Sequence, residues 1–122
     1  PGDHAATFGG NPLATAVANK VMDVINQEEF LAQVKEKGRL LREGIQKIGD
    51  PRLKEMRGRG LLIGAEFIAP VKELISICMQ KGLLLVGAGN NVVRFVPPLT
   101  INEIEINQAL AIFKEALQEW DA

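Results

Sequence analysis

The strongest candidate for a functional residue is an arginine, Arg94, in an apolar stretch. Arg94 is the only charged residue between Lys81 and Glu103, and it lies in the run NVVRFVPPL, residues 91–99. The β-branched and aromatic neighbours favour a half-buried strand, which the two prolines end close to the arginine. In such surroundings a planar guanidinium is suited to hold a carboxylate through two hydrogen bonds. Arg94 is therefore a candidate anion-binding residue; the alternative is a strand-end arginine paired with an acid from elsewhere in the fold.

The first loop is a second candidate anion site. It reads TFGGNP from Thr7 to Pro12 and combines a hydroxyl, two glycines and a helix start. Asn11 can cap the helix, and Pro12 suits its first position. Hydroxyl and N–H groups at a helix start can bind an anion such as phosphate. The loop matches neither the P-loop nor the dinucleotide-binding pattern, and an ordinary loop leading into a helix is the alternative.

The remaining candidates are weaker. The RGRG segment, residues 57–60, could bind an anion, although glycines between strands more often serve backbone geometry. The turn GAGN, residues 87–90, lies beside Arg94 in sequence and could form the rim of the same site. His4 is the only histidine, so a loop role is expected and neither a catalytic triad nor a multi-histidine metal site is possible within the chain. Cys78 is on the apolar side of an expected helix and is predicted to lie in the core.

Composition narrows the functional classes. The 122 residues include 14 basic and 15 acidic side chains, and the net charge is −1. Neither a nucleic acid nor a membrane surface is an expected partner, because both usually require a basic surface. Cys78 is the only cysteine, so no internal disulfide can form, and a reducing, cytoplasmic compartment is indicated. The chain begins on loop residues, as if cut from a longer protein.

Apolar periodicity predicts four helices and four strands. We expect helices at residues 12–26, 28–48, 70–80 and 103–120, and strands at 53–59, 61–67, 83–86 and 92–96. This order predicts an α+β fold, with a small mixed or antiparallel sheet and helices packed on one face. The first helix is apolar nearly all round, which indicates cover by a larger domain or a partner subunit. Gly38 lies on the apolar side of the second helix, where another backbone is expected to come close.

Three motifs, spread over almost the whole chain, resemble one family. They are PGDHAATFGGNPLA at residues 1–14, RGRGLLIGAE at 57–66 and VRFVPPL at 93–99. In this order they are similar to the C-terminal part of a class III pyridoxal-phosphate-dependent aminotransferase. The resemblance implies the small domain of the aspartate-aminotransferase fold (fold type I), with residues 1–26 as an interface loop and linking helix and residues 27–122 as the small α+β domain.

The resemblance also assigns roles to the two anion sites. Thr7 matches the threonine that binds the phosphate of pyridoxal 5'-phosphate, reaching from one subunit into the site of its neighbour in a homodimer. Arg94 matches the arginine that holds the α-carboxylate of the amino acid or of 2-oxoglutarate. Ala6 departs from the pattern, since many relatives have a serine or threonine there that touches the substrate, and no role is carried over to it.

The resemblance implies that the groups performing the chemistry are not in this chain. The Schiff-base lysine, the acid that pairs with the pyridine nitrogen and the ring-stacking aromatic are expected upstream of Pro1. The chain alone is therefore expected to be inactive and without cofactor, with its own large domain and a second subunit as partners.

The expected reaction of the parent passes an amino group from N-acetylornithine to 2-oxoglutarate, a step of arginine biosynthesis. Family members that use ornithine, succinylornithine or 4-aminobutyrate share much of the pattern, so these substrates are alternatives. An alternative of another class is a stand-alone, non-catalytic α+β domain that binds small anions or a protein partner.

Overall fold

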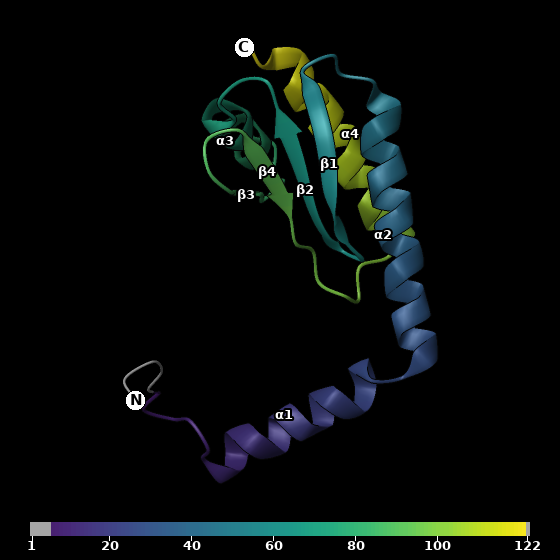
Figure 1. Cartoon of the computed structure of the whole chain (residues 1–122), viewed down its shortest axis with the longest axis vertical. Coiled ribbons are helices and arrows are strands. Elements are labelled where there is room, and N and C mark those ends of the chain that lie inside the picture. The colour runs from purple at the N-terminus through teal and green to yellow at the C-terminus, as the bar shows by residue number, and fades with distance from the viewer. Residues whose placement is uncertain (1–5, 122) are drawn as a thin grey trace. The chain divides into compact units, whose positions relative to one another are not determined.

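The computed structural model describes residues 6–121 of the chain (Figure 1). His4 lies outside the described residues. By its contacts the chain divides into two compact units, Pro1–Gln33 and Val34–Ala122. The division expected at residues 26 and 27 stays a prediction.

The first unit is built around helix α1, Pro12–Ile25. Asn11 is its N-cap, as expected: the Asn11 side-chain oxygen accepts a hydrogen bond of 2.9 Å from the Ala14 N–H, and Pro12 takes the first helical position. No residue of α1 is buried. The apolar surface that the sequence places nearly all round this helix is therefore available for another partner.

The second unit is an antiparallel α+β domain. Its strands are β1 (Leu53–Arg59), β2 (Leu62–Phe67), β3 (Val86–Gly87) and β4 (Val92–Phe95), and its helices are α2 (Glu28–Ile48, shared with the first unit), α3 (Lys72–Gln80) and α4 (Glu103–Glu119). The sheet order is β1-β2-β4-β3, and all three strand pairs are antiparallel. Figure 1 shows α4 behind the sheet and α2 alongside β1. The expected fold class is confirmed, with the antiparallel form of the sheet.

One expected strand is wrong in its bounds. Residues 83–86 were expected to be a strand, but only Val86 and Gly87 are. The Leu83 N–H instead donates to the Cys78 carbonyl at 2.8 Å and finishes the end of α3. Because Leu83 and Leu85 pack against the core, this segment is bound through its side chains without strand pairing. Likewise β4 ends at Phe95, one residue earlier than expected, ahead of the two prolines.

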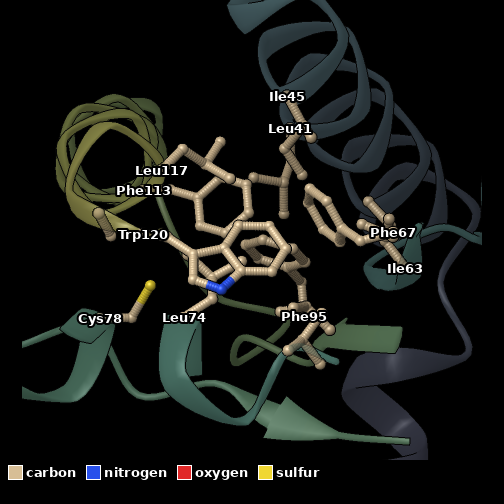
Figure 2. Close-up of a cluster of buried hydrophobic side chains, with 14 of the residues drawn as sticks. Leu41, Ile45, Ile63, Phe67, Leu74, Cys78, Phe95, Phe113, Leu117 and Trp120 are labelled. Atoms are coloured by element: carbon tan, nitrogen blue, oxygen red, sulfur yellow. The ribbon is translucent and has the colours of Figure 1, made fainter. Parts of the chain in front are cut away.

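One hydrophobic core joins the helices to the inner face of the sheet (Figure 2). Phe113 of α4 contacts Phe95 edge-to-face, with ring centroids 5.1 Å apart, and Phe67 contacts Trp120 in the same way at 5.4 Å. Such pairs stabilise a core beyond their buried area. Cys78 is fully buried, as predicted, and its burial raises the pKa of the thiol to about 11. Cys78 is therefore a packing residue.

Two glycines bring α2 against the β1–β2 turn. A β-carbon built on Gly38 would lie 2.2 Å from the carbonyl oxygen of Gly60, so only glycine fits there. Gly60 itself has a φ of 56°, which favours glycine. The close backbone approach expected at Gly38 is confirmed.

Arg52 joins the start of β1 to the end of α4. Its guanidinium donates to both carboxylate oxygens of Asp50, at 3.0 and 2.8 Å, to the Leu117 carbonyl at 2.6 Å and to the Trp120 carbonyl. It also lies 4.4 Å from the centre of the Trp120 ring. One partly buried arginine thus satisfies carbonyls at the helix end, where a cation is favoured.

Substituting Gly38 by alanine tests the contact with Gly60. We expect Gly38→Ala to lower the free energy of unfolding by about 2–3 kcal/mol, because the clash is with backbone and outweighs the better helix propensity of alanine. Gly44→Ala in the same helix is the matched control. There the new β-carbon would meet the end of the Leu110 side chain, which can move, so the cost should stay below about 1 kcal/mol. Urea unfolding of both variants measures the difference, and equal costs would contradict this account.

Acidification tests the Asp50–Arg52 ion pair. The Arg52 guanidinium lowers the pKa of Asp50 from its ordinary value, so the pair stabilises the fold fully above pH about 4 and less as the pH falls through the folded-state pKa. We expect Asp50→Asn to cost about 1–3 kcal/mol at pH 7 and clearly less at pH 3, measured by urea unfolding. Asp23→Asn, at an exposed carboxylate of α1, is the control and should have little effect at either pH. A cost for Asp50→Asn that does not shrink with acid would refute the assignment.

Candidate functional site

The side chains of β2 alternate strictly between the core and the outside. Ile63, Ala65 and Phe67 are buried, while Leu62, Gly64 and Glu66 belong to the other face. On that outer face Gly64 pairs with Arg57 of β1 on one side and with Arg94 of β4 on the other. The sheet therefore brings together two arginines that are 37 residues apart in sequence, separated only by a glycine.

The missing side chain at Gly64 leaves a hollow between the two arginines. Its volume is about 330 Å³, and its lining residues are Arg57, Gly58, Leu62, Gly64, Ala88, Val92 and Arg94. Ala88 belongs to the turn at residues 87–90, so this turn lines the same hollow as Arg94, and its role as the rim of a binding site stays a prediction. Apolar walls with two guanidinium groups are suited to a small molecule that carries a carboxylate.

Arg94 is exposed on this face, which corrects one expectation. The sequence indicated a half-buried strand with its arginine in apolar surroundings. The strand is half-buried, with Val93 and Phe95 in the core, but Arg94 lies on the exposed face. Among residues 6–121, no carboxylate lies within ion-pair distance of Arg94 and its side chain makes no hydrogen bond. Within that range the alternative of a structural ion pair is not met, and the guanidinium is available to a ligand.

Arg57, in contrast, is held by carboxylates. Its Nη1 donates to Glu66 at 2.5 Å and to Glu55 at 3.1 Å, while Lys54 binds the other oxygen of Glu66 at 2.7 Å. Hydrogen bonds from Lys54 and then Arg57 lower the pKa of Glu66, and the bond to Glu66 raises the pKa of Arg57. The lowered pKa favours the ionised form of Glu66, which makes it a partner for Arg57.

A second arginine fixes the backbone on both sides of Arg57. Arg42 of α2 donates to the carbonyls of Met56 and Gly58, at 3.4 and 2.8 Å. These carbonyls belong to an edge strand, so Arg42 satisfies groups that a sheet edge would otherwise leave open. Neither Arg42 nor Glu66 was expected from the sequence to take part in this site. Arg42 has no signal in sequence because it is one of many charges on α2, whereas Glu66 closes the RGRGLLIGAE motif.

Thr7 belongs to the first unit. Residues 7–10 form a turn, closed by a hydrogen bond of 3.1 Å from the Gly9 N–H to the Ala6 carbonyl. Thr7 is exposed, and its hydroxyl has no hydrogen bond to any other residue of the range 6–121. A free hydroxyl a few residues ahead of a helix start fits an anion such as phosphate. Ala6 is also exposed and offers only its backbone.

The guanidinium of Arg94 and the hydroxyl of Thr7 are groups of the kind that binds anions. Within the described part of the chain, no three histidine, cysteine, aspartate or glutamate side chains are grouped so that they could hold a metal ion. A search of the same residues finds no helix with the length and apolar character needed to cross a membrane. The hollow beside Arg94 is therefore a candidate carboxylate site, and the loop at Thr7 is a separate candidate anion site.

Comparison with known proteins defines the class. Residues 1–117 match the model of the family described as Aminotransferase class-III. The chain therefore belongs to the class III aminotransferases, which depend on pyridoxal phosphate.

Acetylornithine aminotransferases recur among the similar proteins. The chain is 43% identical to the acetylornithine aminotransferase of Caldanaerobacter subterraneus, over 98% of this chain and 31% of that protein. The structure of N-acetylornithine aminotransferase from Stenotrophomonas maltophilia matches 91% of the chain and 32% of its own, with 34% identity and a TM-score of 0.86. That of Toxoplasma gondii ornithine aminotransferase matches 98% of the chain and 30% of its own, with 32% identity and a TM-score of 0.81. The chain spans about a third of the length of these relatives.

The exposed apolar side chains of α1 predict self-association of the chain. Leu13, Val17 and Val21 are spaced four residues apart and are 76%, 56% and 50% exposed. An apolar patch of this kind usually has a partner. We therefore expect the 122-residue chain to form species larger than a monomer as its concentration rises. Replacing these three residues with glutamine should return it to the monomer.

Sedimentation velocity over a range of concentrations measures this effect. The matched control replaces Asn19 and Lys20, exposed polar residues of the same helix, with glutamine, and should leave the association unchanged. A strictly monomeric wild-type chain at high concentration would contradict the prediction.

Proposed function

We propose that this chain is the C-terminal part of an aminotransferase that passes an amino group from N-acetylornithine to 2-oxoglutarate, a step of arginine biosynthesis. The observation that carries the proposal is Arg94, exposed over a hollow and without a partner among the described residues, in the motif VRFVPPL of a chain 43% identical to an acetylornithine aminotransferase. Ornithine is the nearest alternative substrate, because an ornithine aminotransferase matches nearly the same share of the chain. Succinylornithine and 4-aminobutyrate are further alternatives.

Arg94 binds the α-carboxylate of each substrate in turn. Its planar fork can donate two parallel hydrogen bonds to a carboxylate, which fixes both the position and the direction of the molecule. The apolar side chains of Leu62 and Val92 line the same hollow and exclude water from one side of the pair, which strengthens it. Arg94 thus orients the substrate, and that orientation is its contribution to the rate.

Thr7 binds the phosphate group of pyridoxal 5'-phosphate through its hydroxyl. The free hydroxyl and the following helix start fit this anion, and the family's dependence on the cofactor supports the assignment. When bound, the cofactor supplies the electron sink that amino-group transfer requires. In the homodimer, Thr7 serves the site of the neighbouring subunit.

The groups that complete the site are proposed to lie upstream of this chain. None of the lysines in the sequence stands in the family's Schiff-base motif, so the chain alone is expected to be inactive and to lack the cofactor. The large domain of the same subunit and the second subunit would supply the rest, and α1 offers them an apolar surface. We also propose a cytoplasmic location, supported by the single, buried cysteine.

Substitution of Arg94 by lysine in the full-length enzyme tests the carboxylate site. Lysine keeps the charge but loses the fork, so kcat/KM should fall about 10- to 100-fold with both N-acetylornithine and 2-oxoglutarate. The cofactor's absorbance, followed in each half-reaction, gives the two values.

Arg59→Lys is the matched control, because Arg59 is exposed on β1 but does not line the hollow. It should change kcat/KM less than twofold. Unchanged kinetics for Arg94→Lys in both half-reactions would mean that Arg94 has only a structural role.

A further inference from the structure

The hollow has two arginines, although a single carboxylate needs only one. Gly64 of β2 lies opposite Arg57 of β1 on one side and Arg94 of β4 on the other. The α-carbons of the two arginines are therefore two strand spacings apart, about 10 Å. Both side chains lie on the outer face and line the same hollow. If both guanidinium groups were free, a dicarboxylate could lie across the hollow with one end on each.

Carboxylates of the protein occupy one of the two arginines. Glu66 accepts a 2.5 Å hydrogen bond from Arg57 and is itself fixed by Lys54 at 2.7 Å. Its side chain is 20% exposed, against 57% for Glu55, the other carboxylate on Arg57, whose bond is longer at 3.1 Å. Glu66 is therefore the main partner of Arg57, and no such partner is present for Arg94 among residues 6–121.

We propose that Glu66 is a specificity-determining residue: by holding Arg57, it leaves one free guanidinium in the hollow, so that ligands bind there by one carboxylate end and not across both arginines. This inference rests on the proposed function, in which Arg94 binds the α-carboxylate. It matters for 2-oxoglutarate, whose second carboxylate would otherwise compete for Arg57 and hold the molecule across the sheet. Glu66 acts through Arg57 and is a positioning residue.

The test measures binding of two non-reactive acids to the full-length holoenzyme. Glutarate is butyrate with a second carboxylate on its terminal carbon. The two acids therefore differ only in whether a second carboxylate is present. In Glu66→Gln the amide is neutral and of similar size, so Arg57 loses its main ionic partner and keeps only the longer contact with Glu55. We expect the Kd of glutarate to fall about fivefold, measured by calorimetry at ~0.15 M salt to screen the change in net charge, and the Kd of butyrate to change less than twofold.

Two further variants separate this role from a structural one. In Glu66→Gln combined with Arg57→Gln the gain for glutarate should disappear, because the released guanidinium is gone. Glu43→Gln removes a carboxylate that pairs with Arg39 on α2, away from the hollow, and should leave both Kd values unchanged. If Glu66→Gln fails to fold, Glu55→Gln replaces it in the test, because Glu55 is the other carboxylate on Arg57. We then expect a smaller decrease in the Kd of glutarate.

The kinetics of the same variants give a second readout. In Glu66→Gln we expect inhibition by glutarate to strengthen about fivefold, while KM for N-acetylornithine stays within twofold of wild type. An unchanged Kd for glutarate in Glu66→Gln, or a gain that persists without Arg57, would overturn the proposal. Failure of the proposed function is distinguishable, because butyrate would then bind Arg94→Lys as well as it binds wild type.

Discussion

The register of β2 between β1 and β4 is the constraint on which the site depends. Ile63, Ala65 and Phe67 fill the core, so the residues between them must point to the other face. A slip of one residue would bury Glu66 and expose Phe67, at a cost of several kcal/mol. The same alternation fixes the row in which Arg57, Gly64 and Arg94 lie side by side. Core packing and ligand recognition are thus two consequences of one pairing.

Contacts at both ends of β1 maintain that register. At one end Arg52 binds Asp50 and the last carbonyls of α4, and at the other Gly38 lets α2 lie against the turn at Gly60. Between them, Arg42 binds two carbonyls on the open edge of β1. These three contacts join the strand that carries Arg57 to both long helices. Because none of them uses the outer face, that face is left for recognition.

Much of this fold could be predicted from the sequence because its local signals agree. The helix at residues 28–48, the strand at 53–59 and the cap at Asn11 occur as expected, since periodicity, glycines and capping residues indicate the same bounds. The strand at residues 83–86 was wrong because three leucines have high apolarity in any conformation. Leu83 and Leu85 pack against the core without strand pairing, while Leu84 is 80% exposed, and this tertiary arrangement is not recorded by periodicity.

The candidate site was predictable in part. Arg94 could be singled out because it is a lone charge in an apolar run, but its exposure could not, since strand alternation alone does not say which face is covered. The pairing of Arg57 with Glu66 and Lys54 depends on which residues lie opposite one another across strands. Spacing in sequence carries no such information until the register is known.

The exposure of Arg94 changes the reason for regarding it as a binding residue. A buried arginine without an acid would need a ligand for its stability, whereas an exposed arginine is solvated and needs none. The lack of a partner is therefore weak support alone. What gives it weight is the contrast with Arg57, which is also exposed on the same face and yet is bound by two carboxylates. Among residues 6–121 the surface neutralises one of two neighbouring arginines and not the other, beside a hollow that a glycine keeps open, and this asymmetry is what supports the proposed binding of a single carboxylate at Arg94.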